Sequence, residues 1–140
     1  MKGVENIKVN DKIVALVFRN NTPVNELRFL TDNENPFQIG IHNRKKGVVL
    51  TPHSHKLPKP LIIRKIQEIL YVVSGKILIT IYTKKGEPIS KKILTKGDSI
   101  LLMDEGHGVE FLQKSRIFEV KQGPYPGPAF AKNYFKKIQN

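Results

Sequence analysis

Short runs of β-branched and aromatic residues follow one another along most of this chain, and clusters of Asn, Asp, Gly and Pro separate them. Runs of this kind predict β-strands. We expect strands over residues 12–19, 26–31, 37–43, 47–55, 68–74, 76–83, 88–94, 99–103, 107–113 and 116–122. Because each short strand buries one face and needs a facing sheet, this pattern predicts an all-β sandwich or barrel.

The length of the chain limits its organisation. A chain of 140 residues is the size of one ordinary domain, so we predict a single domain over residues 1–140. The three prolines in residues 123–128 cannot continue a strand. Residues 123–140 are therefore predicted to form a C-terminal arm.

Composition excludes several classes of site. The absence of cysteine excludes disulfides, thiolate metal sites and cysteine nucleophiles. No apolar stretch of about 18 residues and no charged-then-apolar leader is visible, so we expect a soluble cytoplasmic protein that does not contact a membrane.

The chain is strongly basic, with 24 Lys and Arg residues against 12 Asp and Glu residues. Its lysines are spread in pairs, such as Lys84-Lys85 and Lys91-Lys92, at expected turns and strand ends. This spread is typical of a solvated surface with lysine at sheet edges. An anionic small-molecule ligand is the second interpretation. Nucleic acid is the third and least favoured, because no aromatic-and-basic strand motif or recognition helix is present.

Histidines mark the candidate site. His53 and His55 lie two residues apart in an expected strand, where alternate side chains share a face, so both imidazoles can bind one metal ion. Glu68 opens the next expected strand, and a carboxylate beside imidazoles suits a divalent transition metal. His107 alternates with core-like residues, which favours an inward histidine. His42 is interpreted as a structural or surface residue.

These residues carry a family resemblance. The run from Gly47 to His53 and His55, followed by Glu68 and Gly75, resembles the first motif of the cupin family. That motif has a glycine, five residues, His-x-His, a spacer, a glutamate, six residues and a glycine. The spacer has twelve residues here, where the family usually has three or four.

The run from Gly97 to His107 is similar to the second cupin motif, with Met103 in place of the usual proline and one residue fewer before the histidine. The resemblance covers roughly residues 37–123 and implies an antiparallel jelly-roll β-barrel, with strands in residues 12–31 added to its sheet. It also implies one divalent metal ion, Fe, Mn, Ni or Zn. The implied ligands are His53, His55, Glu68 and His107.

Other residues can supply chemistry around such a metal. Tyr71 and Tyr82 are candidates for a general acid, or they form an aromatic wall. Arg64 and Lys65 in the long spacer are candidates for binding phosphate or carboxylate. Glu119 and Lys121 alternate on one face of the last expected strand, where they either reach the cavity mouth or form an exposed ion pair.

Two classes of function stay open. The first is a metal-dependent isomerase, epimerase or oxygenase acting on a small anionic or sugar-derived molecule. The second is a non-catalytic module that binds a small ligand. Residues 119–125 are loosely similar to the end of small cupins of surface-polysaccharide biosynthesis, which implies a nucleotide-linked sugar as ligand. Open sheet edges, and the pairing common among small cupins, predict a homodimer.

Overall fold

The computed structural model describes residues 2–56, 65–124 and 126–135. Contacts within the chain divide it into two compact units. The first, which we call the sandwich unit, comprises Met1–Thr22 and Lys65–Asn140. The second, Pro23–Arg64, we call the hairpin unit. We describe each unit by itself.

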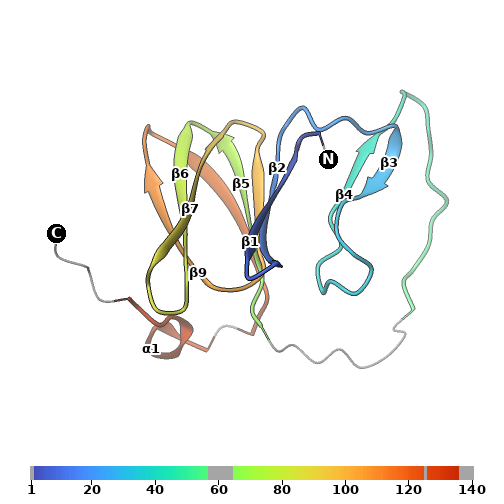
Figure 1. Ribbon diagram of the computed structural model, residues 1–140. Coiled ribbons are helices and arrows are strands. Elements are labelled where there is room, and N and C mark those ends of the chain that lie inside the picture. Colours follow the sequence, from blue (N-terminus) through green and yellow to red (C-terminus); the bar gives the residue numbers. More distant parts are fainter. Residues whose placement is uncertain (1, 57–64, 125, 136–140) are drawn as a thin grey trace. The chain divides into compact units, whose positions relative to one another are not determined.

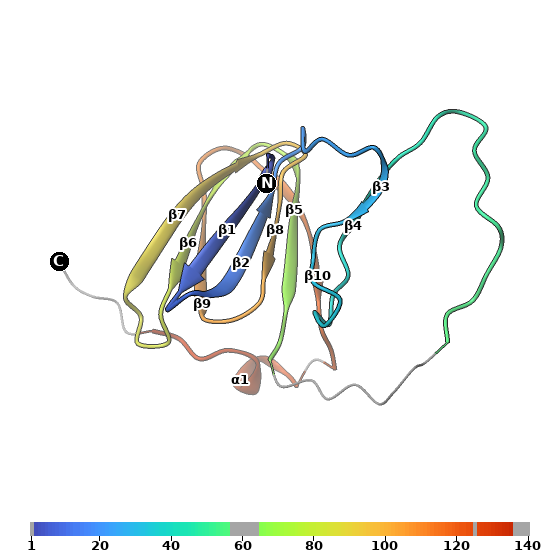
Figure 2. The same ribbon diagram turned by 45° about the vertical axis from the view of Figure 1, so that its right-hand side comes forward.

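The sandwich unit contains two antiparallel sheets (Figures 1 and 2). The five-stranded sheet has the order β1-β2-β8-β5-β10 and the three-stranded sheet the order β7-β6-β9. Their strands are β1 (Val4–Val9), β2 (Lys12–Phe18), β5 (Glu68–Ser74), β6 (Lys76–Tyr82), β7 (Pro88–Thr95), β8 (Ser99–Leu102), β9 (Gly106–Phe111) and β10 (Arg116–Lys121). The predicted all-β class with antiparallel pairing is confirmed. Neither sheet of the described strands closes into a barrel.

The two sheets share one apolar core. Alternate residues of β5 and β6, such as Leu70 and Ile79, are almost fully buried. Strand alternation sends these side chains to one face of each sheet. The resulting cluster joins residues of both sheets: Ile7, Val14, Ala15, Val17, Leu70, Val72, Ile77, Ile79, Ile81, Leu94, Ile100 and Leu102. Burying each Val, Leu or Ile side chain stabilises the fold by roughly 1.5–3 kcal/mol.

The connection between β5 and β6 requires a glycine. Gly75 has a φ of 86°, which L-residues with side chains rarely adopt. A Cβ there would also overlap the Ser115 side chain and the Lys114 carbonyl oxygen. The turn lies between the strands that the sequence predicts over residues 68–74 and 76–83.

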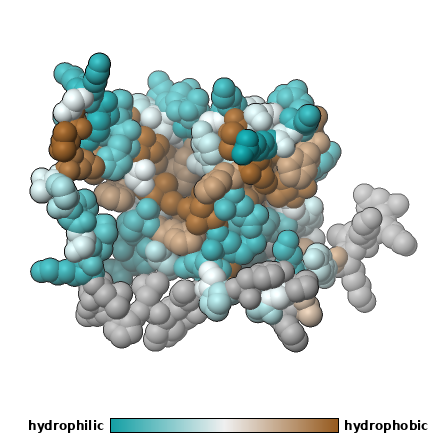
Figure 3. Space-filling model, turned by 180° about the vertical axis from the view of Figure 1, so that it is seen from behind, coloured by the Kyte–Doolittle hydropathy of each residue, from teal (hydrophilic) through white to brown (hydrophobic). Residues whose placement is uncertain are grey.

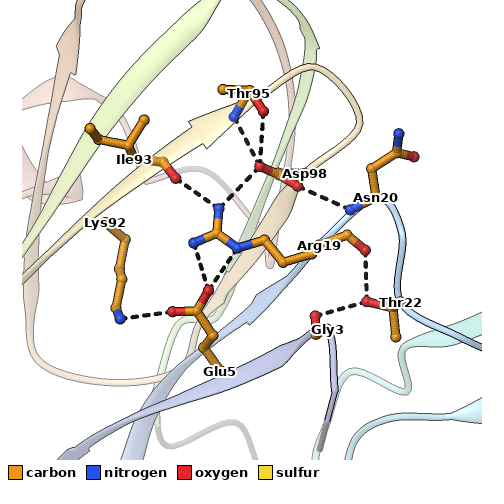
Figure 4. A network of polar contacts seen from close by, with 9 residues as sticks. All are labelled: Gly3, Glu5, Arg19, Asn20, Thr22, Lys92, Ile93, Thr95 and Asp98. Carbon is orange, nitrogen blue, oxygen red and sulfur yellow. Dashed lines mark hydrogen bonds and ion pairs between the residues drawn. The ribbon is translucent and has the colours of Figure 1, made fainter.

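An ion-pair network joins the edges of the two sheets (Figure 4). Arg19, just after β2, donates to Glu5 of β1 at 2.7 Å and to Asp98 at 3.1 Å. Lys92 of β7 donates to the other oxygen of Glu5 at 2.7 Å. Asp98 also accepts the backbone N–H of Thr95 at 3.0 Å. The network thus ties β1 and β2 to the β7–β8 turn.

The hairpin unit contains one two-stranded antiparallel sheet, formed by β3 (Glu26–Phe29) and β4 (Gly40–Asn43). The strand predicted over residues 47–55 is wrong, because residues 48–56 form no strand. Val49 is 85% exposed there, so its β-branched run has no facing sheet to bury it. β2 joins the five-stranded sheet, whereas β3 of the predicted 12–31 region pairs with β4 instead.

The C-terminal segment forms a short helix, α1 (Pro128–Ala131), and then an extended stretch. Phe135 packs against the Tyr82 ring, with 6.0 Å between ring centroids. A Cβ on Gly106 would overlap the Phe135 ring, so the glycine allows this close approach. Within the described ranges, no helix is long and apolar enough to cross a membrane. Viewed from behind, the molecule also carries hydrophobic surface among hydrophilic surface (Figure 3).

Candidate metal-binding site

Two of the four predicted ligands meet inside the sandwich unit. Glu68 is the first residue of β5 and shares its face with the core residues Leu70 and Val72; its side chain is 11% exposed. His107 of β9 lies opposite the core residue Ile81 of β6 in the register, so it shares the inner face of that sheet, and its side chain is 32% exposed. The distance between Glu68 Oε1 and His107 Nε2 is 3.6 Å. A carboxylate of one sheet and an imidazole of the other therefore face each other across the sandwich.

Lys121 and Glu119 complete this cluster. Lys121 lies opposite Glu68 in the pairing of β10 with β5, which places both side chains on the inner face. Lys121 Nζ lies 3.3 Å from Glu68 Oε2 and 2.6 Å from Glu119 Oε1. Both residues of β10 are exposed, so they form the exposed ion pair, and Lys121 also contacts Glu68. We call Glu68, His107, Glu119 and Lys121 the inner polar cluster.

The surroundings of Glu68 keep its carboxyl group ionised. Burial raises the pKa of Glu68. The nearby His107 and Lys121 lower this pKa by more than burial raises it, so the net pKa lies below its ordinary value. A negatively charged oxygen pair inside a sandwich is a good binding group for a cation. The inner polar cluster therefore supplies charge of the sign that a metal ion needs.

His53 and His55 lie in the hairpin unit, in the strand-free run that follows Gly47. The same-face argument from a strand therefore does not apply to them. Their rings are nevertheless adjacent, with 5.2 Å between centroids and an interplanar angle of 77°. His53 Nδ1 lies 2.8 Å from the Thr51 carbonyl oxygen. A neutral His53 donates its Nδ1 proton in this bond, which leaves Nε2 free to bind a metal.

The structure thus brings the predicted ligands together in pairs. Glu68 with His107 belongs to the sandwich unit, and His53 with His55 belongs to the hairpin unit. Among residues 2–56, 65–124 and 126–135, no group of three or more His, Cys, Asp and Glu side chains is assembled for a metal. The set of four ligands stays a prediction.

The predicted substrate-binding residues have different outcomes. Arg64 lies outside the described residues. Lys65 forms an ion pair with Asp104, which also contacts Lys12 at 3.0 Å and Lys84 at 3.6 Å. Burial raises the pKa of Asp104, but hydrogen bonds from Lys65, the backbone and Lys12 hold it far below its ordinary value. Lys65 therefore has an ion-pair partner within the sandwich unit, and its role toward a substrate stays a prediction.

Both candidate tyrosines lie on outer faces of the sandwich. Tyr71 alternates with Leu70 and Val72, is 42% exposed and thus points away from Glu68. Tyr82 lies opposite Gly106 in the register, on the face of β6 that Phe135 covers. Neither side chain lies on the inner face that carries Glu68, and the role of both tyrosines stays a prediction. His42 is exposed on β4, in keeping with a surface histidine.

Sequence reasoning missed the part that Asp104 plays. The carboxyl group of Asp104 contacts Lys12 and Lys65, which lie 92 and 39 positions away in the chain, and also Lys84. The only local signal is the Asp104-Glu105-Gly106 run before β9, which reads as a turn. A cluster made by distant residues has no signature in the spacing of one short segment.

We compared the chain with protein-family models, with curated proteins and with solved structures, and none of the three comparisons found a match.

Proposed function

We propose that this protein is a small metal-binding protein of the cupin type, with one divalent ion held by Glu68, His107, His53 and His55. The observation that supports the proposal best is the pair formed by Glu68 and His107, which face each other at 3.6 Å from opposite sheets. Both of these ligands lie in the sandwich unit. In this proposal the open sandwich is a jelly roll whose strands β8, β9 and β10 alternate between the two sheets.

The Glu68–His107 pair fits a metal ion. Two ligands of one ion, each about 2.0–2.2 Å from it, lie about 2.8–3.6 Å apart at angles between 90° and the tetrahedral angle. The observed 3.6 Å is close to that separation. The donor set of one carboxylate and up to three imidazoles suits Fe, Mn, Ni or Zn. When bound, such an ion polarises a substrate oxygen or acidifies water.

The proposed substrate is a small anionic or sugar-derived molecule, with a nucleotide-linked sugar as one candidate, and the proposed reaction is an isomerisation, epimerisation or oxygenation. The excess of twelve positive charges supports an anionic ligand. Lys121, which is exposed at the end of β10 and contacts Glu68, supports it further.

Metal analysis of purified variants tests this proposal. After dialysis against a buffer that supplies trace divalent metals, the wild type should hold about one divalent ion per chain. Glu68→Gln with His107→Ala should lose it, because both interior ligands are removed. Glu110→Gln with His42→Ala is the matched control, since these residues are exposed on β9 and β4. Equal metal content in the two double variants would contradict the proposal.

A second candidate function is a metal-free binding module. It is favoured by one observation, that the Lys121 ammonium already neutralises Glu68 without a metal. In that case the wild type should bind small anions equally well after treatment with a chelator. If the chelator removes anion binding together with the metal, this second function is excluded.

A further inference from the structure

Lys121 is placed where a metal ion would have to compete with it. It is the last residue of β10 and shares the inner face with Glu68. Its ammonium contacts Glu68 at 3.3 Å and Glu119 at 2.6 Å. One cation thus lies between two carboxylates, one of which is a proposed metal ligand.

A divalent ion on Glu68 Oε1, the oxygen that faces His107, would weaken the attraction between Glu68 and the Lys121 ammonium, which contacts Oε2. The ion would bind at about 2.0–2.2 Å from the carboxylate oxygens, closer than the ammonium does. Because like charges at such short range repel each other, ion binding would push Lys121 away from Glu68. Glu119 offers the ammonium a second partner, at the shorter of the two distances. Lys121 would then stay beside the ion and have free donor hydrogens.

We propose that Lys121 is a displaceable cation, which neutralises Glu68 in the metal-free protein and binds an anionic oxygen of the substrate once the metal has taken Glu68. This inference rests on the proposed function. It narrows the substrate class to molecules with a carboxylate or phosphate group that lies next to the metal-bound oxygen. Lys121 is thereby a substrate-binding residue, and Glu119 is a positioning residue that acts through it.

Competition between Lys121 and the metal ion for Glu68 predicts whether each variant binds the metal more tightly or more weakly. Lys121→Met should bind Mn²⁺ at least about tenfold more tightly than the wild type, because Glu68 loses its competing partner. Glu119→Gln should bind Mn²⁺ more weakly, because the ammonium then returns wholly to Glu68. Lys114→Met removes the same charge from an exposed position in the β9–β10 turn and should leave the affinity unchanged. Isothermal titration calorimetry with Mn²⁺ measures all four proteins, and circular dichroism checks their folding.

The possible outcomes separate the two proposals. If the wild type binds Mn²⁺ but Lys121→Met binds it equally or more weakly, the inference about Lys121 is overturned and the metal site stands. If the wild type binds no divalent ion, the proposed function fails and the inference fails with it. Tighter binding by Lys121→Met and weaker binding by Glu119→Gln support both.

Inorganic phosphate tests the substrate class. Bound Mn²⁺ accelerates the ³¹P relaxation of phosphate that binds beside it, so the Mn²⁺-loaded protein reports its own phosphate affinity. We expect Lys121→Met to weaken phosphate binding at least about tenfold and Lys114→Met to leave it unchanged. Equal phosphate affinity in the Mn²⁺-loaded wild type and Lys121→Met would overturn the substrate role of Lys121.

Discussion

Asp98 and Glu68 are both buried carboxylates that the sandwich keeps ionised, but with different partners. Asp98 accepts backbone N–H groups of Thr95 and Asn20 and pairs with Arg19, so its partners lie at the end of β7 and just after β2. Glu68 has the ionisable side chains of His107 and Lys121 instead. Fixed backbone donors indicate a structural carboxylate, whereas exchangeable side-chain partners suit a site that receives a ligand.

The Asp98 network predicts an acid-dependent stability. Burial raises the pKa of Asp98, but hydrogen bonds from Thr95, Asn20 and Arg19 hold it below its ordinary value of 3.8. A depressed pKa in the folded state means that Asp98 stabilises the fold above pH 3.8 and that this contribution is lost as pH falls through the lower, folded-state pKa. Asp98→Asn should lower the free energy of unfolding at pH 7 by about 1.5–3 kcal/mol.

Urea unfolding at pH 7 and pH 3 checks this prediction. The difference between wild type and Asp98→Asn should shrink at pH 3. Asp11→Asn is the control, because Asp11 is exposed and its positive φ of 61° suits asparagine equally. A difference that stays constant with pH would mean that packing, not charge, explains the loss.

At the scale of elements, the sequence predicts some strands correctly and fails for others, and the difference lies in strand pairing. Residues 68–74 and 76–82 alternate clearly around a turn glycine, and both form strands close to the expected bounds. Residues 47–55 are also rich in β-branched residues, yet they form no strand. The local residue pattern indicates how readily a segment adopts the β-conformation. A strand also needs a neighbouring strand with unpaired backbone groups. The sequence of one segment does not show that partner.

β1 was not expected, and it shows a signal that strand propensity overlooks. Three polar residues interrupt its run, Glu5, Asn6 and Lys8. The turn that follows has positive φ angles at Asn10 and Asp11, as a tight hairpin requires. Asn-Asp before the run of β2 could have indicated a hairpin. The convergence of Glu68, His107 and Lys121 has no such local signal, because it depends on the pairing and packing of three different strands.

The Gly75 turn gives the prediction at this scale. Gly75→Ala should destabilise the protein by at least about 2 kcal/mol, because it combines backbone strain with overlap of Ser115 and Lys114. Gly47→Ala is the matched control. Gly47 has a similar φ of 88°, but nothing lies within 4 Å of its added Cβ. Chemical denaturation of both variants should show the larger loss for Gly75→Ala, and equal losses would contradict the overlap.

At the scale of the whole molecule, two features of the sandwich unit favour self-association. β10 is an edge strand of the five-stranded sheet. Phe118 of β10 is 61% exposed, beside the half-exposed Tyr71 of β5. Exposed aromatic side chains along an open sheet edge favour pairing with a second copy.

We therefore predict a homodimer that Phe118→Ser weakens. Light scattering at micromolar concentrations should give twice the chain mass of 16.0 kDa for the wild type. Phe118→Ser should shift the mass toward that of one chain. Phe29→Ser, which removes an equally exposed phenylalanine from β3, is the control. A wild-type mass of 16.0 kDa would refute the dimer.

At the scale of the whole molecule, the central claim is a metal ion at Glu68 and His107. A crystal structure of the Mn²⁺-loaded protein, with data collected near the manganese absorption edge, is the most direct test. We predict one anomalous peak per chain, about 2.0–2.3 Å from Glu68 Oε1 and His107 Nε2. Lys121 should then contact Glu119 and not Glu68. No peak at Glu68, with Lys121 still bound to its carboxylate, would contradict the site.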